Sequence, residues 1–74
     1  MKISVKIKFG AERNKFESFG GGRYLVYMIY KKEDDSAMPY LVHVLSKEVG
    51  ADPKHLRYLG KKGSGDFEEH MFEI

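Results

Sequence analysis

Residues 1–9 read Met-Lys-Ile-Ser-Val-Lys-Ile-Lys-Phe, and apolar and polar side chains alternate along them without a break. In a strand, successive side chains point to opposite faces, so a period of two is typical of a strand with one buried face. This stretch therefore predicts a half-buried strand, with its apolar face toward a core and its lysine and serine face toward solvent.

A second strand-like stretch, residues 23–31, reads Arg-Tyr-Leu-Val-Tyr-Met-Ile-Tyr-Lys and is apolar or aromatic on both faces. A chain of 74 residues forms one small domain, whose core can easily cover only one of these faces. We expect the other face to need a cover or a partner. Residues 10–22 are interpreted as a connection, which Gly20, Gly21 and Gly22 close with a tight reversal.

The middle of the chain predicts one helix. Asp35 or Ser36 is a suitable N-cap, Pro39 falls in the first turn, and Gly50 follows the last helical residue. Apolar residues recur between these signals at spacings of three and four: Met38, Leu41, Val42, Leu45 and Val49.

A short strand is predicted over residues 55–59, a turn over 60–66 and a last strand over 70–74, with 67–69 in that strand or its lead-in. The fold class that follows is α+β, with β-β-α-β-β order. We expect two layers, a sheet of about four strands with one main helix packed on one face.

Composition narrows the functional classes. The chain has no cysteine, which excludes disulfides and thiolate metal sites, and no apolar run approaches the roughly 18 residues of a membrane span. No secretion signal is visible, so the expected location is cytoplasmic, without membrane contact. The absence of Gln, Thr and Trp, with many Lys and Glu, resembles the composition of thermophile proteins.

Charge is distributed unevenly along the chain. Residues 1–33 carry a net charge of +5 and residues 34–74 carry −3, which together give the overall +2. One interpretation is that solvent-facing strand positions happen to be lysines. The other is a basic face that meets an anionic partner such as nucleic acid.

Four stretches suggest a known family. Residues 5–16 and 22–28 fit an opening hairpin with a strand, a Gly-Ala turn and a second strand that starts with arginine; residues 35–41 and 49–54 match in register. Over nearly its whole length the chain resembles the small YggU-like family, although Phe9 stands where that family usually has proline. The resemblance implies the α+β fold and brings no established biochemical role.

The resemblance also implies which face of residues 23–31 is buried, a choice that period two alone leaves open. It places Tyr24, Val26 and Met28 under the helix. Leu25, Tyr27 and Ile29 would then lie on the open side of the sheet.

Nothing in the sequence forms a pattern typical of catalysis. His43, His55 and His70 lie on different predicted elements, and none has a ligand at metal-site spacing. Neither glycine-rich segment matches a phosphate-binding loop, because neither leads into the helix. We therefore expect no catalytic, cofactor-binding or metal-binding residues, and a non-enzymatic protein is favoured over a small enzyme assembled on oligomerisation.

The open sheet face remains as the candidate site. The leading hypothesis is a binding or interaction module that uses this apolar, lysine-edged face to contact a partner protein or a second copy of the chain. The alternative is binding of RNA or another nucleic acid through the basic N-terminal half, with an aromatic ring for base stacking. The candidate residues are Lys6, Lys8, Arg13, Lys15, Arg23, Leu25, Tyr27 and Ile29.

Overall fold

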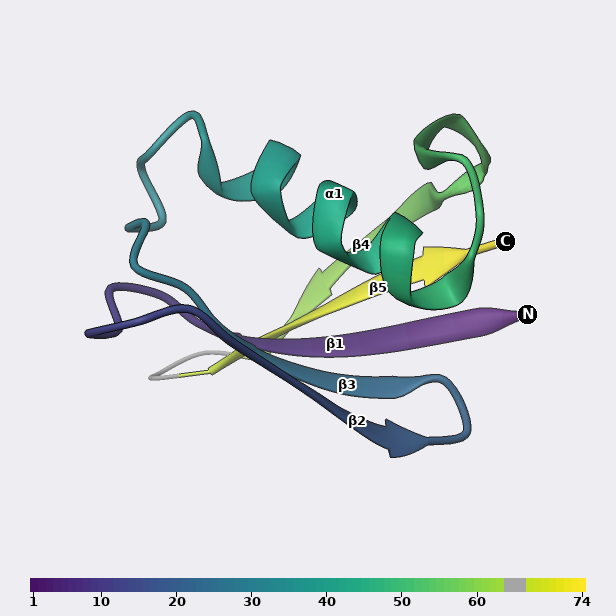
Figure 1. The fold of residues 1–74 in the computed structure, drawn as a ribbon, viewed down its shortest axis with the longest axis horizontal. Coiled ribbons are helices and arrows are strands. Elements are labelled where there is room, and N and C mark those ends of the chain that lie inside the picture. The colour runs from purple at the N-terminus through teal and green to yellow at the C-terminus, as the bar shows by residue number, and fades with distance from the viewer. Residues whose placement is uncertain (64–66) are drawn as a thin grey trace.

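The computed structural model describes residues 1–63 and 67–74. Its elements, in chain order, are β1 (Lys2–Lys8), β2 (Lys15–Gly20), β3 (Arg23–Tyr27), α1 (Ala37–Val49), the 3-10 turn η1 (Pro53–His55), β4 (Arg57–Lys62) and β5 (Glu68–Glu73). The strands form a single sheet in the order β2-β3-β1-β5-β4, with α1 on one side of it (Figure 1). The predicted α+β class, with one main helix packed on a sheet, is confirmed.

The sheet has five strands in the described residues, where the sequence predicted about four. The additional strand is β2, in the segment that we interpreted as a connection. It pairs antiparallel with β3 through the reversal at Gly20–Gly22, and it lies at the edge of the sheet. As a result β1 and β3 pair in parallel and do not form a hairpin with each other.

The reversal between β2 and β3 depends on glycine. All three of its glycines have positive φ, and a side chain on Gly22 would place its Cβ 2.8 Å from the carbonyl oxygen of Lys2. Gly22 also accepts a hydrogen bond from the backbone N–H of Ser4. The hairpin can therefore pack against β1 only with glycine at this position.

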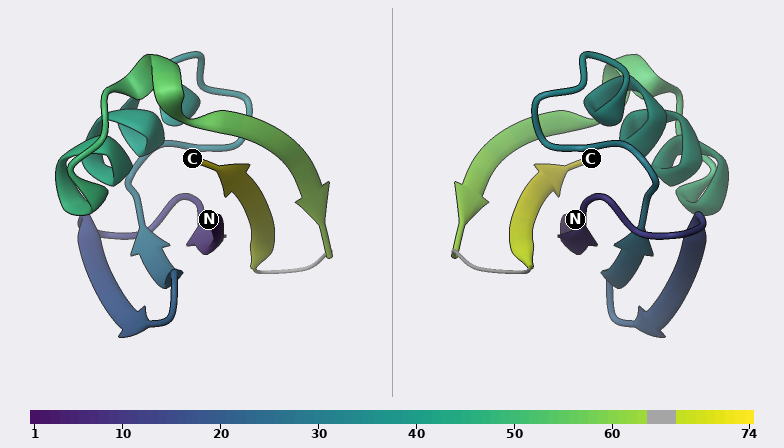
Figure 2. Two further views of the ribbon diagram at one scale, coloured as in Figure 1. Left: turned by 90° about the vertical axis from the view of Figure 1, so that its right-hand side faces the viewer. Right: turned by 90° about the vertical axis from the view of Figure 1, so that its left-hand side faces the viewer.

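The core lies between α1 and the covered side of the sheet, as the two views of Figure 2 show. The predicted alternation of β1 is confirmed, since Ile3, Val5 and Ile7 are completely buried. Val26 and Met28 are buried beside them, as expected for this face of residues 23–31. Leu41 and Leu45 of α1 and Phe72 of β5 complete this core.

The ends of α1 follow the predicted signals. Ser36 is the N-cap residue and Pro39 lies in the first turn. Gly50 adopts a left-handed conformation, and its N–H donates to the carbonyl of Ser46. Within residues 1–63 and 67–74, α1 is too short and too polar to cross a membrane, and no other helix could do so.

The later elements differ in their bounds from the expected ones. We predicted a turn over residues 60–66, but residues 60–62 belong to β4. Residues 64–66 of that predicted turn lie outside the described residues. Strand β5 begins at Glu68, so of residues 67–69, which we assigned to the last strand or its lead-in, the last two are part of the strand. β3 ends at Tyr27 rather than continuing to Lys31.

Candidate functional site

The side of the sheet away from α1 is referred to as the open face. Its centre is β1, where Lys6 is in register with Leu25 of β3 on one side and with Glu69 of β5 on the other. Alternate residues of each strand share this face: Lys2, Ser4, Lys6 and Lys8; Arg23, Leu25 and Tyr27; Glu69, Met71 and Glu73; Lys15 and Glu17; Arg57 and Lys62.

The structure brings most of the predicted candidate residues together. Lys6, Lys8, Lys15, Arg23, Leu25 and Tyr27 all belong to the open face. Arg13 lies in the loop before β2 and lines an open hollow with Lys15 and Tyr27. Ile29 lies beyond the end of β3; its side chain is 50% exposed and its N–H donates to Asn14 Oδ1.

The carboxylates of the open face are each paired with a cation. Glu17 pairs with Lys15 at 2.9 Å, Glu69 with Lys62 at 3.4 Å and Glu73 with Arg57 at 3.5 Å. The hydroxyl of Ser4 also donates to Glu69, and this bond is the main cause that lowers the pKa of the Glu69 carboxyl. The acidic groups of the face are therefore already neutralised by neighbours.

Four cations of the open face remain outside these pairs. Lys2, Lys6, Lys8 and Arg23 form no ion pair with any carboxylate of residues 1–63 and 67–74. They lie on two adjacent strands, β1 and β3, at the middle of the sheet. The centre of the open face thus carries a positive charge that the described part of the chain does not balance.

Two aromatic rings that sequence reasoning did not assign to the site belong to this surface. Phe19 is 57% exposed and Phe67 is 38% exposed, and together with Lys6 and Leu25 they line an open hollow of about 300 Å³. We had placed Phe19 in the connection and Phe67 in the last strand or its lead-in. One feature of the sequence could have indicated that these rings belong to the site. Both are large aromatic residues, next to Gly20 and to β5, in segments that are otherwise rich in polar residues.

Phe67 partly covers Tyr27. Their ring centroids are 6.3 Å apart, and the planes are tilted by 46°. The ammonium group of Lys8 lies 5.6 Å from the Phe67 centroid and that of Lys15 lies 6.0 Å from the Tyr27 centroid. The surplus apolar surface of residues 23–27 is therefore only partly covered by the chain itself, and the covering ring remains accessible.

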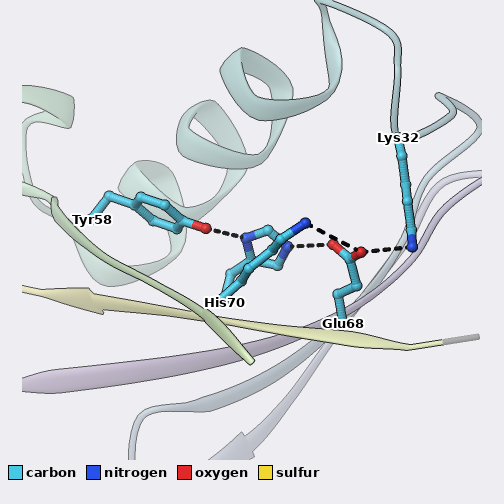
Figure 3. A network of polar contacts seen from close by, with 5 residues as sticks. Lys32, Tyr58, Glu68 and His70 are labelled. Atoms are coloured by element: carbon cyan, nitrogen blue, oxygen red, sulfur yellow. Dashed lines mark hydrogen bonds and ion pairs between the residues drawn. The ribbon is translucent and has the colours of Figure 1, made fainter. Parts of the chain in front are cut away.

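The other side of β5 carries a buried polar network that the sequence did not predict (Figure 3). Glu68 and His70 share the face that Phe72 uses to enter the core, and they are only 6% and 4% exposed. His70 Nε2 lies 3.2 Å from Glu68 Oε1, and His70 Nδ1 lies 2.9 Å from the hydroxyl of Tyr58. The ammonium groups of Lys32 and Lys61 lie 2.6 and 3.5 Å from Glu68 Oε2.

The protonation states of this network follow from its surroundings. The hydrogen bond from Lys32 is the main cause that holds the pKa of Glu68 below its usual range, so this carboxylate is ionised and only accepts. Burial lowers the pKa of His70, which is neutral at neutral pH. His70 Nε2–H therefore donates to Glu68, and His70 Nδ1 accepts from Tyr58, whose own pKa is raised by burial.

The polar atoms of Glu68 and His70 are satisfied within this network. The lone pair of His70 is occupied by Tyr58, and Glu68 is neutralised by two lysines. No buried side-chain nitrogen or oxygen of the described residues lacks a partner. The network joins β4, β5 and the segment before α1, and we assign it to stability.

The described residues contain no cluster of three or more His, Asp or Glu side chains able to hold a metal ion. No protein-family model, no curated protein and no solved structure matches the chain, so its membership of the YggU-like family stays a prediction.

Proposed function

We propose that the protein is a binding module whose open sheet face holds a nucleic-acid strand. The observation that carries the proposal is the charge pattern of that face. Its carboxylates are paired, while Lys2, Lys6, Lys8 and Arg23 form no ion pair with the described residues. The last three of these cations lie beside the exposed rings of Phe19 and Phe67. Cations for phosphates and rings for bases are the two components of such interfaces.

The same charge pattern disfavours contact between two copies of the chain through this face. Two open faces brought together would bring two surfaces of net positive charge into contact, because a two-fold interface uses the same surface twice. Like charges across an interface cost free energy. A partner protein would need an acidic surface with an apolar centre. Any nucleic-acid strand combines these two properties, because its phosphates are negatively charged and its bases are flat rings.

Salt dependence of binding tests the proposal. A labelled oligonucleotide of about ten nucleotides is titrated with the protein at about 50 mM and about 200 mM salt, and fluorescence anisotropy gives the affinity. We expect affinity to fall as salt rises, because phosphate contacts release counterions. Absence of salt-sensitive binding to single strands and to duplex would rule the proposal out.

A charge-matched pair of variants locates the interface. The double variant Lys6→Ala/Lys8→Ala removes two cations of the open face, and Lys47→Ala/Lys54→Ala removes two exposed cations of α1 and η1. We expect the first to reduce the salt slope by about 0.7 for each lysine lost and the second to leave it nearly unchanged. Equal effects of both variants would show that net charge, and not the open face, determines binding.

Sedimentation of the free protein distinguishes the alternative partner. A monomer at high concentration agrees with the proposal. A dimer that the Lys6→Ala/Lys8→Ala substitutions strengthen would instead identify the open face as a contact between copies, since removing cations relieves their repulsion.

A further inference from the structure

The hollow on the open face is lined by two aromatic rings, one aliphatic side chain and one lysine. Phe19 from the end of β2 and Phe67 from just before β5 line it together with Leu25 and Lys6. These four residues come from four separate segments of the chain, and the fold alone brings them together. The volume of about 300 Å³ is at the lower end of the range for small-molecule sites.

Cations continue from this hollow in two directions. Lys6 and Phe19 also line a neighbouring hollow with Arg23, and Lys6 and Phe67 line another with Lys62; Glu69, the ion-pair partner of Lys62, lines both. A ring seated between Phe19 and Phe67 would therefore lie beside Lys6, with Arg23, which forms no ion pair with the described residues, on one side and Lys62, already paired with Glu69, on the other. An isolated apolar ligand would form no electrostatic contact with these flanking charges.

We infer that this hollow receives one unpaired base of the bound strand, stacked on Phe19 and Phe67, with Lys6 facing the adjoining phosphate. This inference rests on the proposed function and adds a selectivity to it. A base in a duplex is stacked and paired, and taking it out costs a few kcal/mol. The protein should therefore prefer single strands to duplexes, while a face that used charge alone would prefer the more highly charged duplex.

Three probes of equal length separate base recognition from charge. They are a single-stranded oligonucleotide of about ten nucleotides, an oligomer with the same phosphates but no bases, and a duplex. We expect the single strand to bind about 5- to 150-fold more tightly than the abasic oligomer, the range for one stacked base. Equal affinity for the two would overturn the inference and leave the proposed function intact, whereas no binding to any probe would overturn both.

Phe19→Ala tests the hollow directly, because this exposed side chain contributes little to the core. Leu59→Ala is its control, since Leu59 is also an exposed apolar side chain, at 41%, and does not line the hollow. We expect Phe19→Ala to reduce affinity for the single strand about 5- to 150-fold and to leave affinity for the abasic oligomer unchanged. Phe67→Ala should behave in the same way, with circular dichroism showing that each variant is folded.

Unchanged single-strand binding by both phenylalanine variants would overturn the base site. An equal loss toward the single strand and the abasic oligomer would also overturn it, because it would show that the rings only maintain the shape of the basic face. Tight binding of an acidic peptide that competes with the oligonucleotide and depends on Phe19 would assign the hollow to a protein side chain instead.

Discussion

The two sides of β5 differ in how their polar groups are satisfied. On the covered side, Glu68 and His70 are almost completely buried, and each of their polar atoms has a partner in the chain. On the open side, Glu69 is paired, but the neighbouring Lys6 of β1 is exposed and belongs to no ion pair with the described residues. Successive residues of the same strand thus meet opposite environments.

This difference separates stability from binding. A buried charge must be paired inside the protein, because its desolvation is otherwise not compensated. An exposed cation has no such requirement and remains available to a ligand. Substitutions on the covered side should therefore change the free energy of unfolding, and those on the open side should change affinity.

The largest effect is expected from Phe72→Ala. This side chain is 1% exposed, and its loss leaves a cavity in the core, so we expect the free energy of unfolding to fall by about 3–5 kcal/mol. Urea denaturation followed by circular dichroism measures this. The adjacent Met71→Ala, on the open side of the same strand, should cost clearly less, and equal costs would contradict the separation.

Glu68→Gln should have an intermediate effect. The substitution keeps an acceptor for His70 but removes the charge that Lys32 and Lys61 share, and we expect a loss of about 1–3 kcal/mol in the free energy of unfolding. Glu69→Gln is the matched control one residue along the strand. Its ion pair with Lys62 lies at the surface, so the expected loss is below about 1 kcal/mol.

His70 makes stability depend on pH. Burial lowers its pKa in the folded protein, so on acidification the unfolded chain takes up a proton before the folded chain does. The free energy of unfolding should therefore decrease as pH falls below about 6.5, by at most about 1.4 kcal/mol per pH unit. Urea midpoints between about pH 8 and about pH 5 measure this slope.

His70→Gln should flatten the slope in that window, while His43→Gln, at an exposed helix position, should leave it unchanged. Below about pH 4.5 a second loss is expected, because Glu68 also has a lowered pKa and the unfolded chain is again protonated first. A slope that persists in His70→Gln would assign the effect to another group.

The smallest effect on stability is expected on the open side. Phe19→Ala should change the free energy of unfolding by less than about 0.5 kcal/mol, because Phe19 is 57% exposed. The same variant should lose affinity for a single strand. A large loss of stability would show that Phe19 supports the fold and would remove the distinction between the two sides.

Strands with one clearly buried face could be predicted from the sequence, and β2 could not. Residues 1–9 alternate strictly because Ile3, Val5 and Ile7 enter the core. The edge strand β2 packs on one neighbour only, and most of its side chains are exposed, so it has no buried face to impose a pattern. Its place is determined by pairing with β3 through the glycine reversal.

The candidate site was predicted only where its residues lie on strands with a clearly buried opposite face. The register of β1 and β3 places the lysines beside Leu25 and Tyr27, as period two predicts once the buried side is known. Phe19 and Phe67 reach the same surface only through a bulge in β2 and the approach of residue 67 to β3, and these are tertiary features. The network was missed because Glu68 and His70 are polar residues at positions of a core face; they precede Phe72 by four and two positions, and this period of two was the signal.

The central position of β1 has a consequence for folding kinetics. β1 is the first strand of the chain, yet its two neighbours are β3 and the last strand, β5. The antiparallel pair β1–β5 therefore closes a loop that spans nearly the whole chain, and such long-range pairing slows folding. During synthesis β1 would keep one unpaired edge until β5 emerges, and this edge is the place where premature association would begin.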